Sequence, residues 1–455
     1  MRYNTYALFI YQGECRLMDD TLRESLKTPE IKKKILFSFL IVSILCLLTI
    51  IPIPGLDHTL AQAKIEEWGS MGDVIDILSC GALTNGSIIS LGIYPFLVAS
   101  IVMQIVTLAV PKLRNIAQMG EEGTKIISKF TRIAALIGAG VFAVLYCIGM
   151  RDAVATSINF WLAIVLCGVS VAIGSAFCGW CVELLNSKGI GDGLTIIILT
   201  GVIHNIPHDL LMPFFEAEHL GLLIAMLYMV MGILLAIGML ILALLINMGE
   251  KKIRILFQKR TVGMKQYGMQ NQVFPLKVTQ AGITPIIYAL TIGLLPSAVV
   301  AMVIPGSENV WAVTFRNMPT SILFIPFFVI YIVLFANVFA MMQFNPYDIS
   351  NQIKQNGGYI QGLKPGKPTS QYLMNLYSNL SSAGTSYLIF VCIVPLLLSL
   401  IPGLNHIAFS GIGLVLIAGG FIEMKTLLDN QLKTEEEKAK QSGKDNKKRK
   451  NYNKK

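Results

Sequence analysis

Long apolar runs alternate with short polar segments along most of the chain. Each run is close to the roughly 20 residues that an α-helix needs to cross the hydrocarbon core of a bilayer. The pattern predicts ten transmembrane helices, over residues 35–52, 88–110, 133–150, 158–182, 190–206, 220–248, 278–304, 318–342, 383–400 and 407–422. The last two lie in one uncharged stretch, which Pro402 and Gly403 divide. The predicted fold class is therefore an all-α polytopic membrane protein.

Composition excludes the soluble classes of protein. Of the 455 residues, 54% are hydrophobic and only 14% are charged, whereas an ordinary soluble domain carries about 25% charged residues. A single soluble core stops growing well before this length. The apolar runs must therefore be covered by lipid.

The distribution of Lys and Arg predicts the orientation of the chain. With the N-terminus inside, 34 of the 37 basic residues fall in cytoplasmic segments, and Lys64, Arg151 and Arg316 fall outside. This bias places both termini in the cytoplasm. The net charge of +10 is then a signature of topology and gives no reason to expect nucleic-acid binding.

Two spans share a Gly-Ile-x-Pro element, at residues 92–95 and 282–285, and would run in opposite directions. Matching interrupted spans are typical of inverted repeats, and ordinary helix packing is the alternative explanation for four shared residues. The predicted organisation is a cytoplasmic segment at 1–34 (in which 1–17 look like a start assigned too far upstream), a first half at 35–206, a second half at 207–427 and a basic disordered tail at 428–455.

Polar residues recur at helical spacing in the same two spans. They are Ser100, Gln104 and Thr107 in one span, and Thr284, Tyr288 and Thr291 in the other. Polar stripes inside a membrane usually face another helix or water rather than lipid. Two readings stay open, ordinary helix packing and a specialised contact between these spans.

The chain offers little for bond chemistry. Glu183 and Asp192 lie at the cytoplasmic ends of spans, and no predicted span has a central charge, which disfavours an ion-coupled carrier. Cys178 and Cys181 form a CxxC without a second pair, and His204 with His208, although spaced like a zinc pair, are expected in a loop. No phosphate-binding loop of the P-loop type occurs. We therefore predict no catalytic residue, metal or cofactor, and no enzyme.

Several short motifs, in order along the chain, resemble SecY, the central subunit of the bacterial Sec protein-conducting channel. They are IPIPGLD at 51–57, SLGIYP at 90–95, ASIVMQ at 99–104, KGIGDG at 188–193, FPLKV at 274–278, AGITP at 281–285, FNP at 344–346 and GLKPG at 362–366. The resemblance implies two inverted five-helix halves around a pore, hinged outside between spans five and six. It also implies a lateral gate between spans two and seven, which would bring the two polar stripes together.

The resemblance implies roles for individual residues. The family's pore is closed by an aliphatic ring, here Ile93, Leu97, Leu194, Ile198, Ile287 and Ile412, the last without the family's motif around it. Such a constriction excludes ions by dewetting. The outer segment at 53–87 is long for a loop, and its part at 71–83 corresponds to the family's plug, with Asp73, Val74, Ile75 and Leu78.

Two cytoplasmic loops, at 249–277 and 343–372, correspond to the family's docking sites for the SecA motor ATPase or the ribosome. Their basic residues include Arg254, Lys259, Arg260 and Lys364, for which positive-inside bias is the alternative explanation. The family usually has arginine at the position of Lys364, and lysine cannot reproduce the planar guanidinium fork. This departure leaves open an accessory paralogue with restricted clients.

The function that the resemblance implies is passage of unfolded polypeptides, led by signal peptides, across the bacterial plasma membrane, with lateral release of transmembrane segments into lipid. Small SecE-like and SecG-like membrane subunits are implied as partners. The rival classes are a small-solute transporter with inverted repeats and a polytopic membrane enzyme. The long basic loops and the missing midplane charge disfavour the transporter, and the lack of catalytic groups disfavours the enzyme.

Overall fold

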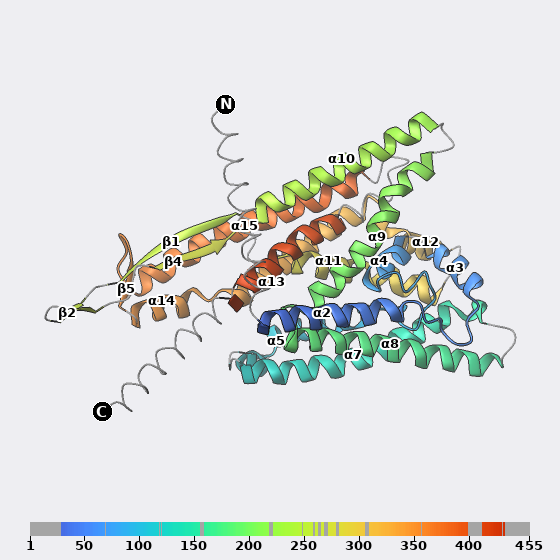
Figure 1. Ribbon diagram of the computed structural model, residues 1–455, viewed down its shortest axis with the longest axis horizontal. Coiled ribbons are helices and arrows are strands. Elements are labelled where there is room, and N and C mark those ends of the chain that lie inside the picture. The colour runs from blue at the N-terminus through green and yellow to red at the C-terminus, as the bar shows by residue number, and fades with distance from the viewer. Residues whose placement is uncertain are drawn as a thin grey trace.

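The computed structural model of the protein shows a bundle of long helices with a small sheet at one end (Figure 1). The structure describes residues 29–432, with gaps at 69, 118, 120, 155–158, 218–221, 248, 258–259, 263–264, 268–271, 279–281, 305–308, 356, 399–411 and 430. Residues 1–17, where the sequence predicts a start assigned too far upstream, lie outside the described residues. Most of the predicted tail at 428–455 lies outside them as well.

Long helices of the first half form one layer of the bundle, in which α2 packs on α8, α8 on α7 and α7 on α5 (Figure 1). The elements are α2 (Pro29–Leu48), α3 (His58–Glu67), α4 (Ser70–Leu78), α5 (Tyr94–Ala109), α6 (Pro111–Ala117), α7 (Glu121–Gly149), the 3-10 helix η1 (Arg151–Ala153), α8 (Phe160–Lys188) and α9 (Gly193–Ala217). Pro95 near the start of α5 is tolerated because the first backbone N–H groups of a helix have no intrahelical partner.

Helices of the second half form the other layer, where α13 packs on α11 and α15 packs on α13 and α10. The elements are α10 (Leu222–Asn247), α11 (Thr284–Val303), α12 (Val310–Arg316), η3 (Met318–Thr320), α13 (Phe324–Gln343), α14 (Pro346–Gln355) and α15 (Lys367–Leu398). A last helix covers residues 412–429; this stretch is called the last helix below. Helices α4, α9 and α11 lie between the two layers.

Among the described residues, five helices are long and apolar enough to cross a membrane. The number becomes six if α5 and α6, which bend by 106° at their junction, are taken as one span. Helices of the bundle carry large exposed apolar side chains, such as Phe39 on α2 and Trp161 on α8, which are exposed by 70% and 78%. Exposed apolar side chains of this size are expected where lipid replaces water as the solvent.

Two helix boundaries differ from the sequence prediction. Helix α9 continues through Pro207 to Ala217, so His204 lies in a helix and not in the expected loop. Helix α15 begins at Lys367, well before the predicted span at 383–400, because its polar first half is helical as well. Apolar length marks the part of a helix that fits the bilayer and does not mark where the helix ends.

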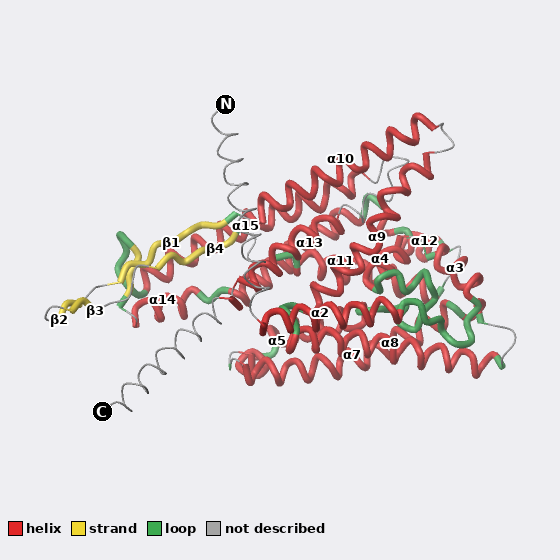
Figure 2. The backbone as a smooth tube through the Cα atoms, in the orientation of Figure 1, coloured by secondary structure: helices red, strands yellow, loops and turns green. Residues whose placement is uncertain are grey.

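The sheet was not predicted, and the all-α fold class needs this correction. Strands β1 (Glu250–Phe257), β4 (Gln272–Lys277) and β5 (Gly358–Ile360) form an antiparallel sheet in the order β4-β1-β5, while β2 (Arg260–Val262) and β3 (Lys265–Tyr267) form a hairpin. Figure 2 shows these strands in yellow at the end of the molecule where α14 lies. The buried positions Ile253, Ile255 and Phe257 alternate with more exposed ones, as expected for a half-buried strand. This short period-2 signal was overlooked.

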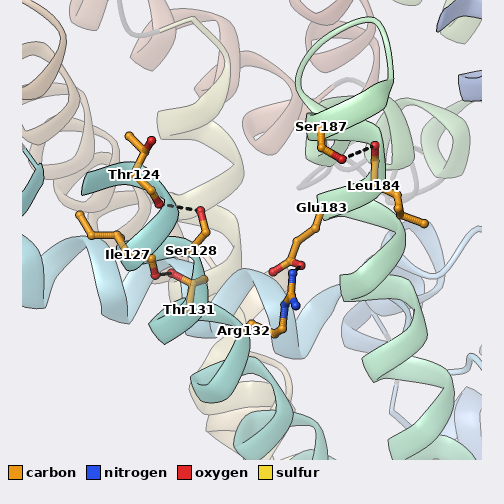
Figure 3. A network of polar contacts seen from close by, with 8 residues as sticks. All are labelled: Thr124, Ile127, Ser128, Thr131, Arg132, Glu183, Leu184 and Ser187. Atoms are coloured by element: carbon orange, nitrogen blue, oxygen red, sulfur yellow. Dashed lines mark hydrogen bonds and ion pairs between the residues drawn. The ribbon is translucent and has the colours of Figure 1, made fainter. Parts of the chain in front are cut away.

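A salt bridge joins the neighbouring helices α7 and α8 of the first half, close to the C-terminal end of α8. The Arg132 guanidinium of α7 donates to the Glu183 carboxylate of α8 (Figure 3). Nearby hydroxyls bond within their own helices, as Ser128 does to the Thr124 carbonyl at 2.9 Å. The carboxylate that the sequence placed at the end of span four is therefore neutralised across the helix pair.

Candidate functional site

A small apolar cavity lies where the two halves meet. Its volume is about 30 Å³, about the space of a single water molecule. Four elements line it: α4 through Val74, Ile77 and Leu78, α9 through Ile198 and Val202, α11 through Ile287, Leu290 and Thr291, and the last helix through Ile412, Gly413 and Leu416. Side chains from both sequence halves thus line the same apolar cavity, with α4 forming one of its walls.

The six predicted ring residues all lie in the apolar core around this cavity, but only three of them line it. Ile198, Ile287 and Ile412 line the cavity. Ile93, Leu97 and Leu194 are buried in the same apolar core but do not line it. Val202, Leu290 and Leu416 also line the cavity and were not predicted. Each lies three or four residues beyond a ring residue on the same helix and so shares its face.

Helix α4 falls within the predicted plug, and glycines on its neighbours let it approach closely. A Cβ added to Gly201 of α9 would overlap the carbonyl oxygen of Ile77. A Cβ added to Gly92, which precedes α5 with φ +49°, would lie 2.5 Å from the carbonyl oxygen of Leu78. The backbone of α4 is therefore held between α9 and the start of α5, with no room for a side chain at either glycine.

The apolar face of α4 points inward. Val74, Ile75 and Leu78 are 8% exposed or less and belong to the central core. On the outer side, the Asp76 carboxylate accepts a hydrogen bond from the Thr84 backbone N–H at 2.9 Å, which ties the end of α4 to the turn that follows. Asp73 lies in α4, but its side chain is outside the described part of the structure.

The two polar stripes meet where α5 lies beside α11. Gln104 Nε2 donates to the Tyr288 hydroxyl at 2.8 Å, and Ser100 Oγ lies 3.4 Å from the same oxygen. Tyr94, at the start of α5, donates its hydroxyl to the Thr291 carbonyl at 3.3 Å. Cross-helix hydrogen bonds of this kind are individually worth about 1 kcal/mol inside a membrane, so the contact is specific without being strong.

The other stripe residues do not join the helices through their side chains in any described hydrogen bond. Thr107 Oγ1 donates to the Met103 carbonyl of its own helix, and Thr291 Oγ1 donates to Ile287 in the same way. Thr284 begins α11 and is half-buried. The contact between α5 and α11 therefore centres on Tyr288, which also packs its ring against Phe339 of α13 with centroids 5.1 Å apart.

The two predicted docking loops share one sheet. Arg254 is exposed on β1, in register with Val273 of β4. Lys364 is exposed in the turn after β5, which pairs with the same β1 strand. Arg260 begins β2, and Lys259 lies outside the described residues. One sheet thus holds two segments that lie about 100 residues apart in the sequence.

The chain matches the family model described as SecY over residues 87–425. Curated relatives named protein translocase subunit SecY include those of Buchnera aphidicola, 33% identical with 80% of this chain and 84% of the relative covered, and Thermus thermophilus, 31% identical with 90% and 94% covered. These relatives are matched across nearly their whole length.

Solved structures share the fold. A protein-conducting channel superimposes with a TM-score of 0.60 at 18% identity, covering 89% of this chain and 93% of the other. A SecY structure concerned with the closed state held by its plug domain gives 0.62 at 19% identity, with the same coverage of both chains. The chain therefore belongs to the SecY family, and it is a channel subunit of a protein translocase.

Proposed function

We propose that unfolded polypeptide crosses the membrane through the cavity between α4, α9, α11 and the last helix. The observation that carries the proposal is that one small apolar cavity is lined mainly by aliphatic side chains from both halves. Aliphatic side chains bind no particular sequence, so they can close around any extended chain, and they exclude ions by dewetting when they meet one another. We assign Ile198, Ile287 and Ile412 to the constriction, with Ile93, Leu97 and Leu194 supporting it.

Helices α5 and α11 would form the lateral gate. Because the contact rests on a few weak hydrogen bonds around Tyr288, separating the helices would cost little, and an apolar segment in the pore could then leave between them into lipid. Ten transmembrane helices in two five-helix halves, with both termini in the cytoplasm, are part of this proposal, supported by the distribution of Lys and Arg.

Energy for transport would come from a docked partner. The sheet presents Arg254 and Lys364 together, which suits an acidic surface of the SecA motor ATPase or a ribosome, in a bacterial plasma membrane with SecE-like and SecG-like subunits. Two structural neighbours, a canine Sec61 channel and a yeast Ssh1 complex, are ribosome-bound. Lys364 in place of the family's arginine fits an accessory channel with restricted clients as well as a housekeeping one.

Changing Ile287 to Asp should make the resting channel leak ions. The carboxylate would enter a cavity that is now apolar, and a buried unpaired charge costs several kcal/mol unless water reaches it. Water would then fill the constriction, and the constriction would no longer exclude ions. The ion current through reconstituted channels should therefore rise well above the wild-type level. Ile287→Leu, which conserves volume, should leave the resting current unchanged. A tight seal in the Ile287→Asp channel would exclude Ile287 from the constriction.

Charge reversal in the docking sheet should weaken partner binding without disturbing insertion. Single changes of Arg254, Arg260 or Lys364 to Glu leave other basic residues in each loop, so the topology should hold. A like charge set against an acidic partner mainly slows association, and we expect about tenfold weaker binding at low salt, with a smaller difference at high salt. Binding of purified motor or ribosomes to the reconstituted channel measures this.

Lys364→Arg is the companion change. Stronger coupling to a housekeeping motor would indicate that this chain has drifted from the common docking geometry, whereas weaker coupling would indicate a partner matched to lysine. If all three Glu variants bind and translocate like the wild type, the basic residues are topology signals and the docking assignment is wrong.

A further inference from the structure

A partly buried lysine lies where the sheet ends and the last helix passes. Lys277 is the final residue of β4, and its ammonium donates to Thr426 Oγ1 of the last helix at 2.8 Å. The same ammonium interacts electrostatically with the carboxylate of Glu423, one turn earlier on that helix. Strand β4 and the last helix are therefore joined by a charged hydrogen bond in a region shielded from water, where such bonds are stronger than on the surface.

The C-terminal end of the last helix, next to Thr426, is also tied to the first half. Gln431, just beyond it, donates from Nε2 to the Ile190 carbonyl at 2.7 Å, and Lys34 of α2 reaches its Oε1 at 3.4 Å. A Cβ added to Gly191 would overlap the side chain of Leu427. Residues 190 and 191 lie in the short loop that leads into α9, which carries Ile198 in the constriction.

The same helix also lies against the start of the gate helix α11. A Cβ added to Gly282, which has φ +62°, would lie 3.5 Å from Glu423 Oε2, and one added to Gly419 would overlap the side chain of Ile283. The last helix thus contacts strand β4 of the proposed docking sheet, the start of α11 and the loop before α9. A displacement of β4, of α11 or of the loop before α9 would therefore shift the last helix, and through it the other two elements. Closely packed contacts transmit such movement because they leave no spare room.

We propose that Lys277 is a positioning residue that transmits docking at the sheet to the pore, through Thr426 and Glu423 of the last helix. The chain passes from β4 to α11 over residues 278–283, so we expect a partner that shifts β4 to move the gate helix. The Lys277 bond makes the last helix move with it, and the contacts of Gln431 and Leu427 carry that movement to α9. This role rests on the docking function proposed for the sheet, but it is separate from docking, because Lys277 is not among the exposed basic residues.

Breaking the link should separate binding from transport. Lys277→Met keeps the length of the side chain and removes its charge. We expect unchanged affinity for the purified motor or ribosomes, and about tenfold slower translocation of an unfolded precursor at saturating partner, within the usual range of coupling between sites. Thr426→Val, a milder change, should act in the same direction, and Lys277→Arg should retain most of the rate. Lys112→Met, an exposed lysine of α6, is the control for loss of charge.

The interaction of Lys277 with Thr426 and Glu423 should also depend on pH. Glu423 lies one residue beyond the predicted last span, and burial together with the Asp192 carboxylate raises its pKa to about 7, against an opposing effect of Lys277. Burial lowers the pKa of Lys277 itself. The charged groups around the pair are Asp192 before α9, Glu250 on β1, and Lys425 and Asp429 on the last helix.

The sign of the pH effect follows from the carboxylate. Glu423 is charged above about pH 7 and attracts Lys277, and it becomes neutral as the pH falls through that value. Translocation per bound partner should therefore fall between pH 8 and pH 6 in the wild type. Glu423→Gln, which keeps the shape of the side chain, should give a low rate that does not change over this interval.

Each result has a distinct meaning. Wild-type translocation by Lys277→Met, or an equal loss in Lys112→Met, would overturn the positioning role. A loss of binding in proportion to the loss of transport would make Lys277 a docking residue and would overturn it too. A wild-type pH profile in Glu423→Gln would remove Glu423 from the link. If Arg254→Glu, Arg260→Glu and Lys364→Glu all bind normally, the docking proposal fails, whichever way the Lys277 variants behave.

Discussion

A disulfide between α5 and α11 should stop translocation completely and reversibly. Leu97→Cys paired with Ile287→Cys, in a background without the native cysteines, would link the two helices near the level of the cavity. Both residues are buried in the core that the two helices share. The bond requires Cα atoms within about 7 Å. Oxidation should block passage of an unfolded precursor, because the helices could no longer part, and reduction should restore it.

A matched link inside the first half serves as the control. A Cβ placed at Gly168 of α8 would lie 3.1 Å from Sγ of Cys147 on α7, so Gly168→Cys with the native Cys147 retained should bridge two helices that need not separate. Oxidation of this pair should leave transport unaffected. Transport that continues through a fully formed α5–α11 link would exclude these helices as the gate.

Changing Gly201 to Ala should displace the plug. Alanine ordinarily stabilises a helix relative to glycine by about 1 kcal/mol, yet here its Cβ would overlap the backbone carbonyl of Ile77 in α4. Overpacking of this kind costs about 1–3 kcal/mol, which corresponds to a shift of about 5- to 150-fold between closed and displaced plug. The resting ion current should rise by a similar factor, and α4 should become more accessible to protease.

The control for this prediction is Gly140→Ala on α7, where an added Cβ would meet nothing within 4 Å. That variant should keep the wild-type current. Deleting residues 71–83 tests the same element without a clash and should also raise the current while the protein still assembles. A sealed channel in both Gly201→Ala and the deletion would show that α4 does not close the pore.

Apolar run length predicted most of the long helices, because burial in lipid demands about the same number of apolar residues from every helix. It could not predict their polar extensions. The turns of α15 before the predicted span are held by contacts such as the stacking of Tyr377 on Phe344, with centroids 4.3 Å apart. Such contacts join distant segments and leave no periodic signal in either one.

The sequence predicted those residues of the candidate site that lie at positions of the family's motifs. Ile93 and Leu97 lie at motif positions, but their exact relation to the cavity depends on how α5 packs against α4 and α7, which no single motif contains. The close approach of Gly201 to the plug was not predicted either. A glycine inside an apolar helix has many explanations until the carbonyl opposite it is known.

Strand β1 has a consequence for how a partner would recognise the two loops. Ile255 pairs with Gln272 of β4 on one side and with Ile360 of β5 on the other, so the spacing between Arg254 and the turn holding Lys364 is fixed before any partner arrives. A partner touching both residues would lose little entropy in ordering them, and the second contact would form at high effective concentration once the first is made. Recognition would then depend on the distance between the two charges as much as on their number.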